Sequence, residues 1–439
     1  MIVQHFCNSF IKIELGPITI VCDPWISTAN HGSWQASPFV SRSLAIDALD
    51  SASHIYISHL HTDHFSEELL KSVILNEKTF IIQKFPTSTL YEKLKNIGAT
   101  SIIELEPWQA KTLGQLTIAI VPQIETNSEA VVTEMNYLLD TSIFIHDTMN
   151  DVLFFNKVDN PLSADSLQSV VRRGIELFGR RPDIATFNVG AASEYPQCFT
   201  GIDRDFEMSR IIQKSLAAFA QELDIVQPKF AFPAGGSYIL AGSLTPLNRW
   251  LAIPSLAQLA TCAKNLSPAM RFENISGGSF VDTKNWSVSE PTLMEDIPNR
   301  SRMESVLFDY QFDGRSFHPE DQLCFDSDNF YEAQVNFLKK VVTFAPNMDW
   351  DIRVALYHDL TISDSGFIVQ ESPDHFVTIR KSESGLKIVL HMDCRAFDGA
   401  VRKMYSWNQL ISGSHAMIER EPNVYEPDVL FSLNFLTIS

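Results

Sequence analysis

Short apolar runs separated by turn residues dominate the first third of the chain and predict a succession of β-strands. Gly16 and Pro17 lie between two such runs and predict a hairpin turn. Many runs are apolar at consecutive positions, which is typical of sheets that are covered on both faces by helices. The predicted strands of this part span residues 9–15, 18–22, 54–58, 79–83, 101–105, 115–121, 137–140, 142–146 and 152–155.

In several later segments the spacing of apolar residues lengthens to a helical period. One helix is predicted to start at Ser66, because a serine hydroxyl can accept a hydrogen bond from a backbone N–H of the first helical turn. A segment rich in Gly, Ser, Pro and Asp, 274–302, predicts a loop. We therefore expect a large domain of residues 1–300 and a smaller α+β domain of residues 301–439. The predicted helices span 66–75, 163–176, 210–223, 250–265 and 329–344, with another near Trp407, and the later strands span 229–232, 350–360, 366–370, 375–379 and 386–392.

The charge balance restricts the class of partner. The 439 residues carry 34 Lys and Arg against 53 Asp and Glu, a formal net charge of −19. A surface this acidic repels phosphate backbones, so we expect no nucleic-acid partner. No apolar stretch reaches the roughly 18 residues of a membrane span, and the start of the chain lacks the pattern of a secretion signal. Six cysteines without a CxxC pair indicate reduced thiols, so we expect a cytoplasmic protein.

The strongest chemical signal is an HxHxDH sequence formed by His59, His61, Asp63 and His64, between a predicted strand and a predicted helix. On an extended backbone His59 and His61 point the same way, because side chains alternate with a period of two. Asp63 and His64 come where the chain turns, so they can address a second ion beside the first. Such ligands suit zinc, iron or manganese better than calcium or magnesium. A solvated turn with incidental histidines is the alternative.

This segment resembles the metal-binding motif of the metallo-β-lactamase superfamily, and the resemblance extends over roughly residues 1–245. It implies a four-layer αββα sandwich with a site for one or two metal ions at the sheet edges. The segments 5–7 and 22–26 are similar to a branch that includes UlaG-type lactonases, phospholipases acting on N-acylethanolamine lipids, and cytidine-monophosphate-N-acetylneuraminate hydroxylase. The last of these is similar furthest along the chain, through residues 156–159, 190–196, 228–238 and 407–425.

That hydroxylase family carries a Rieske domain, whose iron–sulfur cluster needs CxH and CxxH ligand pairs. The present sequence contains neither pair. We therefore expect no internal iron–sulfur electron donor. An oxidation catalysed by this chain would take its electrons from an external redox partner.

The resemblance implies further ligands: a third one for the first metal, a bridging carboxylate and a final histidine. Asp159, just after the predicted strand 152–155, is the expected bridge, with an ordinary turn into a helix as the alternative. The third ligand is normally a histidine after the strand 115–121, where this chain offers Glu125. A branch resembling amino-acid β-hydroxylases of antibiotic pathways uses a glutamate there to hold di-iron, and carboxylate ligands favour iron over zinc. A glutamate on a surface loop is the alternative.

No histidine follows residues 233–238, where the resemblance places the last ligand. The second metal would then have one protein ligand fewer, take a distant ligand or be absent. The candidates by residue type are His31, His318 and His358. Four further residues are expected around the cleft, namely His5 near the metals, Asp23 bonded to a metal-bound histidine, and Gly235 and Gly236, which either present backbone N–H groups to a substrate or pack tightly at a strand end.

Three functions follow from these observations as hypotheses. The favoured one is a di-iron oxygenase that oxidises a small polar metabolite. The second is a zinc-dependent hydrolase of an ester, lactone or phosphodiester, and the third is a degenerate scaffold that binds a ligand without turnover. The expected cofactors are two metal ions, with iron favoured and zinc or manganese as alternatives. The sequence does not decide which substrate is used or whether the chain forms a homo-oligomer.

Overall fold

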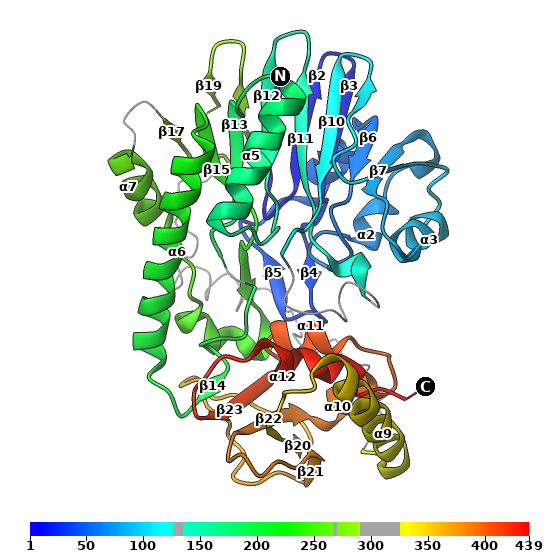
Figure 1. Cartoon of the computed structure of the whole chain (residues 1–439), viewed down its shortest axis with the longest axis vertical. Coiled ribbons are helices and arrows are strands. Elements are labelled where there is room, and N and C mark those ends of the chain that lie inside the picture. The colour runs from blue at the N-terminus through cyan, green and yellow to red at the C-terminus, as the bar shows by residue number, and fades with distance from the viewer. Residues whose placement is uncertain (126–134, 191, 267–269, 290–324, 439) are drawn as a thin grey trace.

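Two large mixed β-sheets lie face to face in the computed structural model, which describes residues 1–125, 135–190, 192–266, 270–289 and 325–438 (Figure 1). The first sheet has the strand order β19-β18-β1-β2-β3-β6-β7-β8, and the second has the order β17-β15-β13-β12-β11-β10-β9. The strands of the first sheet are β1 (Ile2–His5), β2 (Ile11–Leu15), β3 (Ile18–Cys22), β6 (His54–Tyr56), β7 (Thr79–Gln83), β8 (Ser101–Leu105), β18 (Ser279–Asp282) and β19 (Ser287–Val288). Those of the second are β9 (Lys111–Leu113), β10 (Leu116–Val121), β11 (Ser142–Asp147), β12 (Val152–Asn156), β13 (Ile184–Phe187), β15 (Phe230–Pro233) and β17 (Arg271–Phe272).

Apolar side chains fill the space between the two sheets. In β2 the alternate residues Ile11 and Ile13 are buried, whereas Lys12 between them is partly exposed, as the period of two requires. Ile11 and Ile13 join Ile118 and Phe154 of the second sheet in one buried cluster. The inner faces of the sheets therefore share one core.

Helices cover both outer faces. The first sheet packs against α1 (Arg42–Asp50), α2 (Glu67–Leu70) and α3 (Thr89–Asn96), and the second against α5 (Ala164–Phe178), α6 (Arg204–Val226) and α7 (Leu256–Leu266). Ser66 begins α2 as expected, because its hydroxyl accepts the backbone N–H of Leu69. The order of layers is helix, sheet, sheet, helix, which confirms the αββα sandwich.

A smaller α+β unit lies below the sandwich in Figure 1. Its five-stranded sheet has the order β14-β23-β22-β20-β21, and β14 (Phe199–Thr200) comes from the N-terminal part of the chain. The predicted domain boundary at residue 300 lies outside the described residues. The remaining elements of this unit are β20 (Asp351–Tyr357), β21 (His375–Arg380), β22 (Lys387–Asp393), β23 (Ala416–Glu421), α9 (Ser327–Phe344), α10 (Cys394–Val401), α11 (Trp407–Ser412), α12 (Pro427–Ser432) and the 3₁₀ helix η4 (Leu433–Phe435).

A small three-stranded sheet lies between the sandwich and this unit, where β4 and β5 face α11 (Figure 1). It consists of β4 (Thr28–Ala29), β5 (Trp34–Ala36) and β16 (Tyr238–Leu240), and β16 leads into the 3₁₀ helix η3 (Gly242–Trp250). Trp34 and Tyr238 stack across this sheet with their ring centroids 3.6 Å apart.

Four sequence predictions of secondary structure were wrong. The predicted strand 137–140 overlaps the 3₁₀ helix η2 (Asn136–Leu138), and 366–370 contributes only an isolated bridge between Ile362 and Ile368. The predicted loop 274–302 contains β18 and β19, because β18 pairs with β1, which is distant along the chain. The predicted helix 66–75 ends at Leu70, and the 3₁₀ helix η1 (Leu75–Glu77) follows it.

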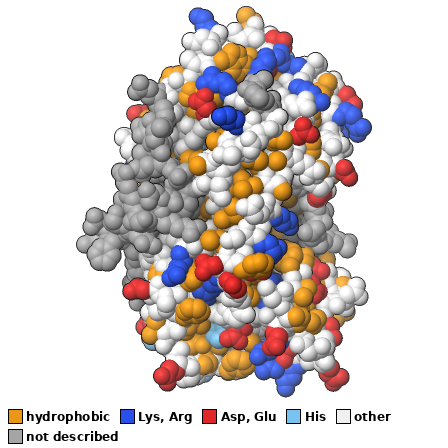
Figure 2. Space-filling model, turned by 90° about the vertical axis from the view of Figure 1, so that its left-hand side faces the viewer, with side chains coloured by type: hydrophobic (Ala, Val, Ile, Leu, Met, Phe, Trp, Pro, Cys, Tyr) orange, Lys and Arg blue, Asp and Glu red, His pale blue; other side chains and the backbone are white. Residues whose placement is uncertain are grey.

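No helix in the described ranges is long and apolar enough to cross a membrane. On the face drawn in Figure 2, Lys and Arg side chains are interspersed with Asp and Glu side chains. The net negative charge is therefore not gathered into one patch on that face.

Candidate metal centre

The candidate site lies at one edge of the sandwich, where strands of both sheets end. In the first sheet β3 runs parallel to β6, and in the second β12 runs parallel to β13 and β13 to β15. Carboxyl ends of parallel strands meet at the same edge of a sheet, which is where such folds place their ligand sites. The loops that follow these ends carry the HxHxDH segment and, in the order β3, β12, β13 and β15, Asp23, Asp159, Asn188 and Gly235.

A first group of ligand atoms comes from His59, His61 and Asp140. The Nε2 atom of His59 lies 2.8 Å from Nδ1 of His61 and 3.1 Å from Oδ1 of Asp140. Two ligand atoms about 2.1 Å from one ion, and at right angles to each other, lie about 3 Å apart. The spacing of the three side chains therefore fits one transition-metal ion.

A second group comes from Asp63, His64 and Asp159. The Nε2 atom of His64 lies 3.0 Å from Oδ2 of Asp159 and 3.4 Å from Oδ2 of Asp63. The rings of His59 and His64 are only 4.2 Å apart between centroids, so the two groups are direct neighbours. The HxHxDH residues thus divide between the two ligand groups.

Asp23 holds a histidine of each group in a ligand orientation. Its carboxylate is fully buried and accepts Nδ1–H of His64 at 3.2 Å and the hydroxyl of Ser58 at 2.8 Å. The Ser58 oxygen in turn accepts Nδ1–H of His59 at 2.9 Å. With both Nδ1 atoms protonated, the Nε2 lone pairs of His59 and His64 are free for a metal. The bond to His64 places Asp23 as the sequence predicted, and its role beside a metal-bound histidine stays a prediction.

Asp159 is fixed by its neighbours on the second sheet. Its Oδ1 atom accepts Nδ2–H of Asn188 at 2.6 Å. A Cβ atom on Gly235 would lie 2.5 Å from the same Oδ1, and one on Gly236 would lie 2.6 Å from the carbonyl oxygen of Gly190. The backbone N–H of Gly235 donates to the carbonyl of Asn8 at 3.1 Å. Close packing, rather than an N–H group offered to a substrate, is therefore the observed reason for glycine at 235.

His5 reaches the ligands through one intermediate residue. Its Nε2–H donates to the backbone carbonyl of Asn8 at 2.8 Å, and Nδ2 of Asn8 donates to Oδ2 of Asp63 at 3.2 Å. Burial lowers the pKa of His5 to about 4, although the bond to Asn8 opposes this shift. His5 is therefore neutral at physiological pH and positions Asn8.

The buried charges of the site call for a cation. Burial raises the pKa of Asp140 to about 8, with the nearby carboxylate of Asp159 as a further cause. Burial, together with His64 and His61, places the pKa of His59 well below its usual value. Oδ1 of Asp140 is buried and has no hydrogen-bond donor among the described residues. An ion of charge +2 between these groups would restore the ionised carboxylate of Asp140 and bind the neutral imidazole of His59. Although burial opposes it, Asp63 and Asp159 raise the pKa of His64 well above its usual value, so a bound ion would take the place of the proton between these groups. The donor set therefore fits a metal.

Asp140 is the ligand candidate that sequence reasoning missed. It lies just before β11, which runs antiparallel to β12, so the start of β11 meets the same edge as the end of β12. Its backbone N–H donates to Oε1 of Gln123 at 2.8 Å, and the hydroxyl of the next residue, Thr141, donates to the carbonyl of Ser58 at 2.7 Å. An acidic residue directly before a buried strand was the available signal.

Other sequence candidates lie away from both groups. Oε1 of Glu125 accepts the backbone N–H of Ser163 at 3.1 Å, so its carboxylate faces the start of α5. The imidazole of His31 contacts the ring of Tyr405, and the side chain of His358 is 68% exposed beside Asp359. His318 lies outside the described residues.

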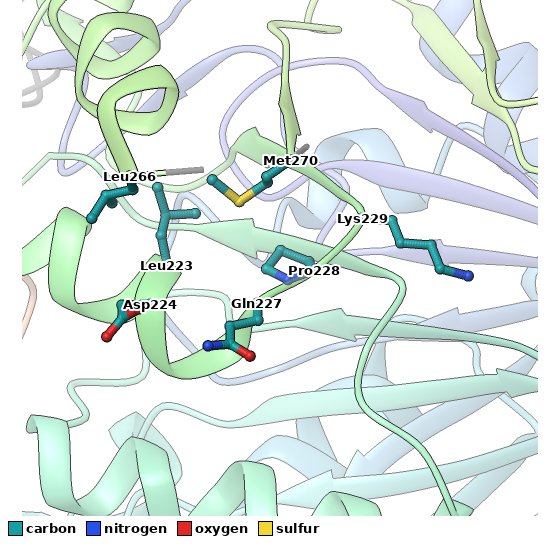
Figure 3. Close-up of a pocket in the computed structure, with 7 residues that line it drawn as sticks. All are labelled: Leu223, Asp224, Gln227, Pro228, Lys229, Leu266 and Met270. Atoms are coloured by element: carbon teal, nitrogen blue, oxygen red, sulfur yellow. The ribbon is translucent and has the colours of Figure 1, made fainter. Parts of the chain in front are cut away.

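A cavity of about 420 Å³ lies at the opposite edge of the second sheet (Figure 3). It is formed where α6 ends and β15 begins, whereas Gly235 follows the far end of β15. Leu223, Leu266 and Met270 give it an apolar wall. This cavity is therefore separate from the metal centre.

No protein-family profile matches the sequence. Over 92 residues, 21% of this chain, the sequence is 34% identical to a protein of Mycolicibacterium smegmatis named "Putative Rieske 2Fe-2S iron-sulfur protein". Over 81 residues, 18% of this chain, it is 36% identical to a protein of Mycobacterium tuberculosis with the same description. The matches cover 18% and 15% of those proteins, so the chain spans less than a fifth of their length. Segments this short do not assign a family to the whole chain.

Three of the solved structures that match each align with 64% of this chain. CmlA, a diiron beta-hydroxylase from Streptomyces venezuelae, is 12% identical with a TM-score of 0.42 over 53% of its own chain. An isothiocyanate hydrolase from Delia radicum gut bacteria is 13% identical with a TM-score of 0.43 over 98% of its chain. The metallo-beta-lactamase fold protein YhfI from Bacillus subtilis is 12% identical with a TM-score of 0.38 over 98% of its chain.

Proposed function

We propose that this protein is a metal-dependent enzyme with a dinuclear centre, and that it is a di-iron oxygenase acting on a small polar metabolite. The observation that carries the proposal is the pairing of two ligand groups 4.2 Å apart between the rings of His59 and His64. A lone histidine cluster would not need a second group with its own two carboxylates beside it. The substrate and the electron donor are external to this chain.

The composition of the ligand groups favours iron. His59, His61 and Asp140 form a set of two histidines and one carboxylate, which is typical of non-haem iron(II) in oxygenases when coordination positions stay open. The second group has one histidine and two aspartates. Three carboxylates over two ions form a harder and more anionic set than the histidine-rich sets that zinc often takes.

The residues of this chain prepare the site for such a pair. Iron bound there would supply the activation of O₂ for oxidation of the substrate. Asp23 and Ser58 hold Nε2 of His64 and His59 toward the ion positions. Asn188 and Gly235 hold Asp159, which we propose as the carboxylate shared between the ions, at the junction of the two groups.

Metal analysis of protein purified without added zinc tests the proposal. We expect about two irons per chain and a visible absorption that is lost on reduction. Stoichiometric zinc, together with turnover of an ester or lactone, would contradict the oxygenase and support the alternative function, a zinc-dependent hydrolase. A protein that takes up no metal would support a non-catalytic scaffold.

Asp140 and Glu125 provide a matched pair of variants for the third ligand of the first ion. We expect Asp140→Ala to lower the iron content from about two per chain to about one, because it removes the carboxylate that the described residues contribute to the first group. Glu125→Ala should keep both irons, because its carboxylate bonds to Ser163. Loss of iron in Glu125→Ala alone would instead assign the ligand to Glu125.

A further inference from the structure

The short helix α11 of the C-terminal unit lies against the HxHxDH segment. The side-chain nitrogen Nδ2 of Asn408, on this helix, is 3.4 Å from Nε2 of His61. Asn408 follows His61 by 347 positions along the chain. A ligand candidate of the sandwich therefore has a hydrogen-bonding neighbour in the other unit.

This neighbour faces the nitrogen of His61 that points away from the first ligand group. Nδ1 of His61 faces Nε2 of His59 at 2.8 Å, so Nδ1 is its ligand atom and Nε2 is its outer nitrogen. When Nδ1 binds a metal, Nε2 carries the proton and needs an acceptor. Rotating the amide of Asn408 by 180° exchanges Nδ2 for Oδ1 at the same position, and Oδ1 can accept that proton.

A second contact from the same unit supports the same segment. Nε2–H of His415 donates to the carbonyl oxygen of Asn30 at 2.8 Å. The side-chain oxygen of Asn30 accepts the hydroxyl of Thr62 at 3.1 Å, and its backbone N–H donates to that hydroxyl at 3.0 Å. Thr62 lies between His61 and Asp63, so the C-terminal unit contacts His61 directly and reaches the next position, Thr62, through Asn30.

We propose that Asn408 is a positioning residue of the metal centre, and that the C-terminal unit is thereby a working part of it. Asn408 selects the form of His61 that is protonated at Nε2 and keeps its ring directed at the first ion. Within the sandwich, Asp23 plays this role for His64, whereas His61 receives it from a residue outside the sandwich. This inference rests on the proposed metal centre.

Titration of the metal-free full chain with Co²⁺, followed by its visible absorption bands, tests the inference. We expect Asn408→Ala to weaken binding of Co²⁺ at the first group about 10- to 100-fold and to alter the bands. Asn434→Ala is the matched control, because Asn434 lies in the same unit and donates to the carbonyl of Phe431. It should bind Co²⁺ like the wild type. Equal affinity and unchanged bands in Asn408→Ala would overturn the inference.

A second pair of variants remains informative if Asn408→Ala does not fold. Asn408→Asp keeps the shape and offers a stronger acceptor to Nε2–H, so its Co²⁺ affinity should equal or exceed that of the wild type. Ser412→Asp adds the same charge one turn along α11 and should change the affinity less. An equal gain in both variants would attribute the effect to charge and overturn the positioning role. Absence of Co²⁺ binding in the wild type would instead refute the proposed function.

Discussion

Gly235 lies so close to Asp159 that a Cβ atom would be 2.5 Å from its Oδ1 atom. The backbone of Gly235 is also left-handed, with φ of +90°. Two independent constraints therefore require glycine at this position, one from backbone conformation and one from the carboxylate of the second ligand group. Packing of the backbone thus determines where a ligand candidate points.

Gly235→Ala should therefore lose the second metal ion. We expect a loss of stability of about 1–3 kcal/mol and a metal content near one ion per chain, because Asp159 is displaced. Gly385→Ala is the control, since Gly385 has φ of +80° but nothing within 4 Å of the added Cβ atom. Gly385→Ala should lose the part of the stability that comes from the strained backbone conformation, as Gly235→Ala does, and keep both ions. Urea unfolding and metal analysis measure the two effects, and equal metal content in both variants would contradict the expectation.

The residues that follow the strand ends could be predicted from the sequence, whereas the directions of their side chains could be predicted only in part. The HxHxDH motif, Asp23 and Asp159 could be placed from the ends of predicted strands, and the structure brings them together. Glu125 and Asp140 occupy the same edge, yet only Asp140 turns toward the histidines. This direction depends on Gln123 and on the register of β11, which the local sequence does not reveal.

At the scale of elements, the loop of residues 30–33 contacts both the C-terminal unit and the HxHxDH segment, and so connects the two. Asn30 and His31 both have left-handed backbones, with φ of 49° and 54°. Such conformations are costly for residues other than glycine and persist where neighbours hold them. His415, Ser33 and Thr62 all bond to Asn30. The loop therefore keeps its shape through contacts with both units.

Gly413→Ala should loosen this contact between elements. Gly413 has an ordinary φ of −72°, but a Cβ atom there would lie 2.8 Å from Oγ of Ser33 and 2.9 Å from Cβ of Asn30. It would also clash with the backbone carbonyl oxygen of Gln409 in α11, so the loss of Co²⁺ binding, rather than of stability, reports on the contact with the loop. We expect a destabilisation of about 1–3 kcal/mol from overpacking, measured by urea unfolding, and weaker Co²⁺ binding at the first group. Unchanged unfolding would show that the loop moves aside without cost.

The elements that could not be predicted from the sequence are those whose formation depends on residues distant along the chain. Strands such as β7 and β8 were predicted at their observed bounds, because each is a continuous run of mostly apolar residues between turn signals. The two residues of β19 and the four of β18 carry no such pattern and exist as strands through pairing that starts at β1. The predicted strand 137–140 became a 3₁₀ turn that leads directly to Asp140.

At the scale of the whole molecule, the metal centre joins the two sheets. His59, His61, Asp63 and His64 follow β6 of the first sheet, whereas Asp140 and Asp159 belong to loops of the second. Each group takes ligands from both sheets. Two ions bound as we propose would therefore cross-link the halves of the sandwich.

Removal of metal should for this reason lower the stability of the whole chain. A ligand present at about 100 times its dissociation constant stabilises the native state by about 2.7 kcal/mol, so we expect a chelator to lower the unfolding temperature. The chelator should lower the unfolding temperature of Asp140→Ala by less, because this variant already lacks the first metal ion. Calorimetry with and without chelator measures both, and an equal shift in the two proteins would contradict the cross-link.

The wide separation of the ligand residues along the chain also sets an order of events during biosynthesis. The HxHxDH segment leaves the ribosome before Asp140 and Asp159, and Asn408 follows much later. A nascent chain thus exposes four ligand side chains well before it can enclose two ions. If the proposed metal centre and the role of Asn408 hold, full metal loading is therefore expected only after Asn408 has been synthesised.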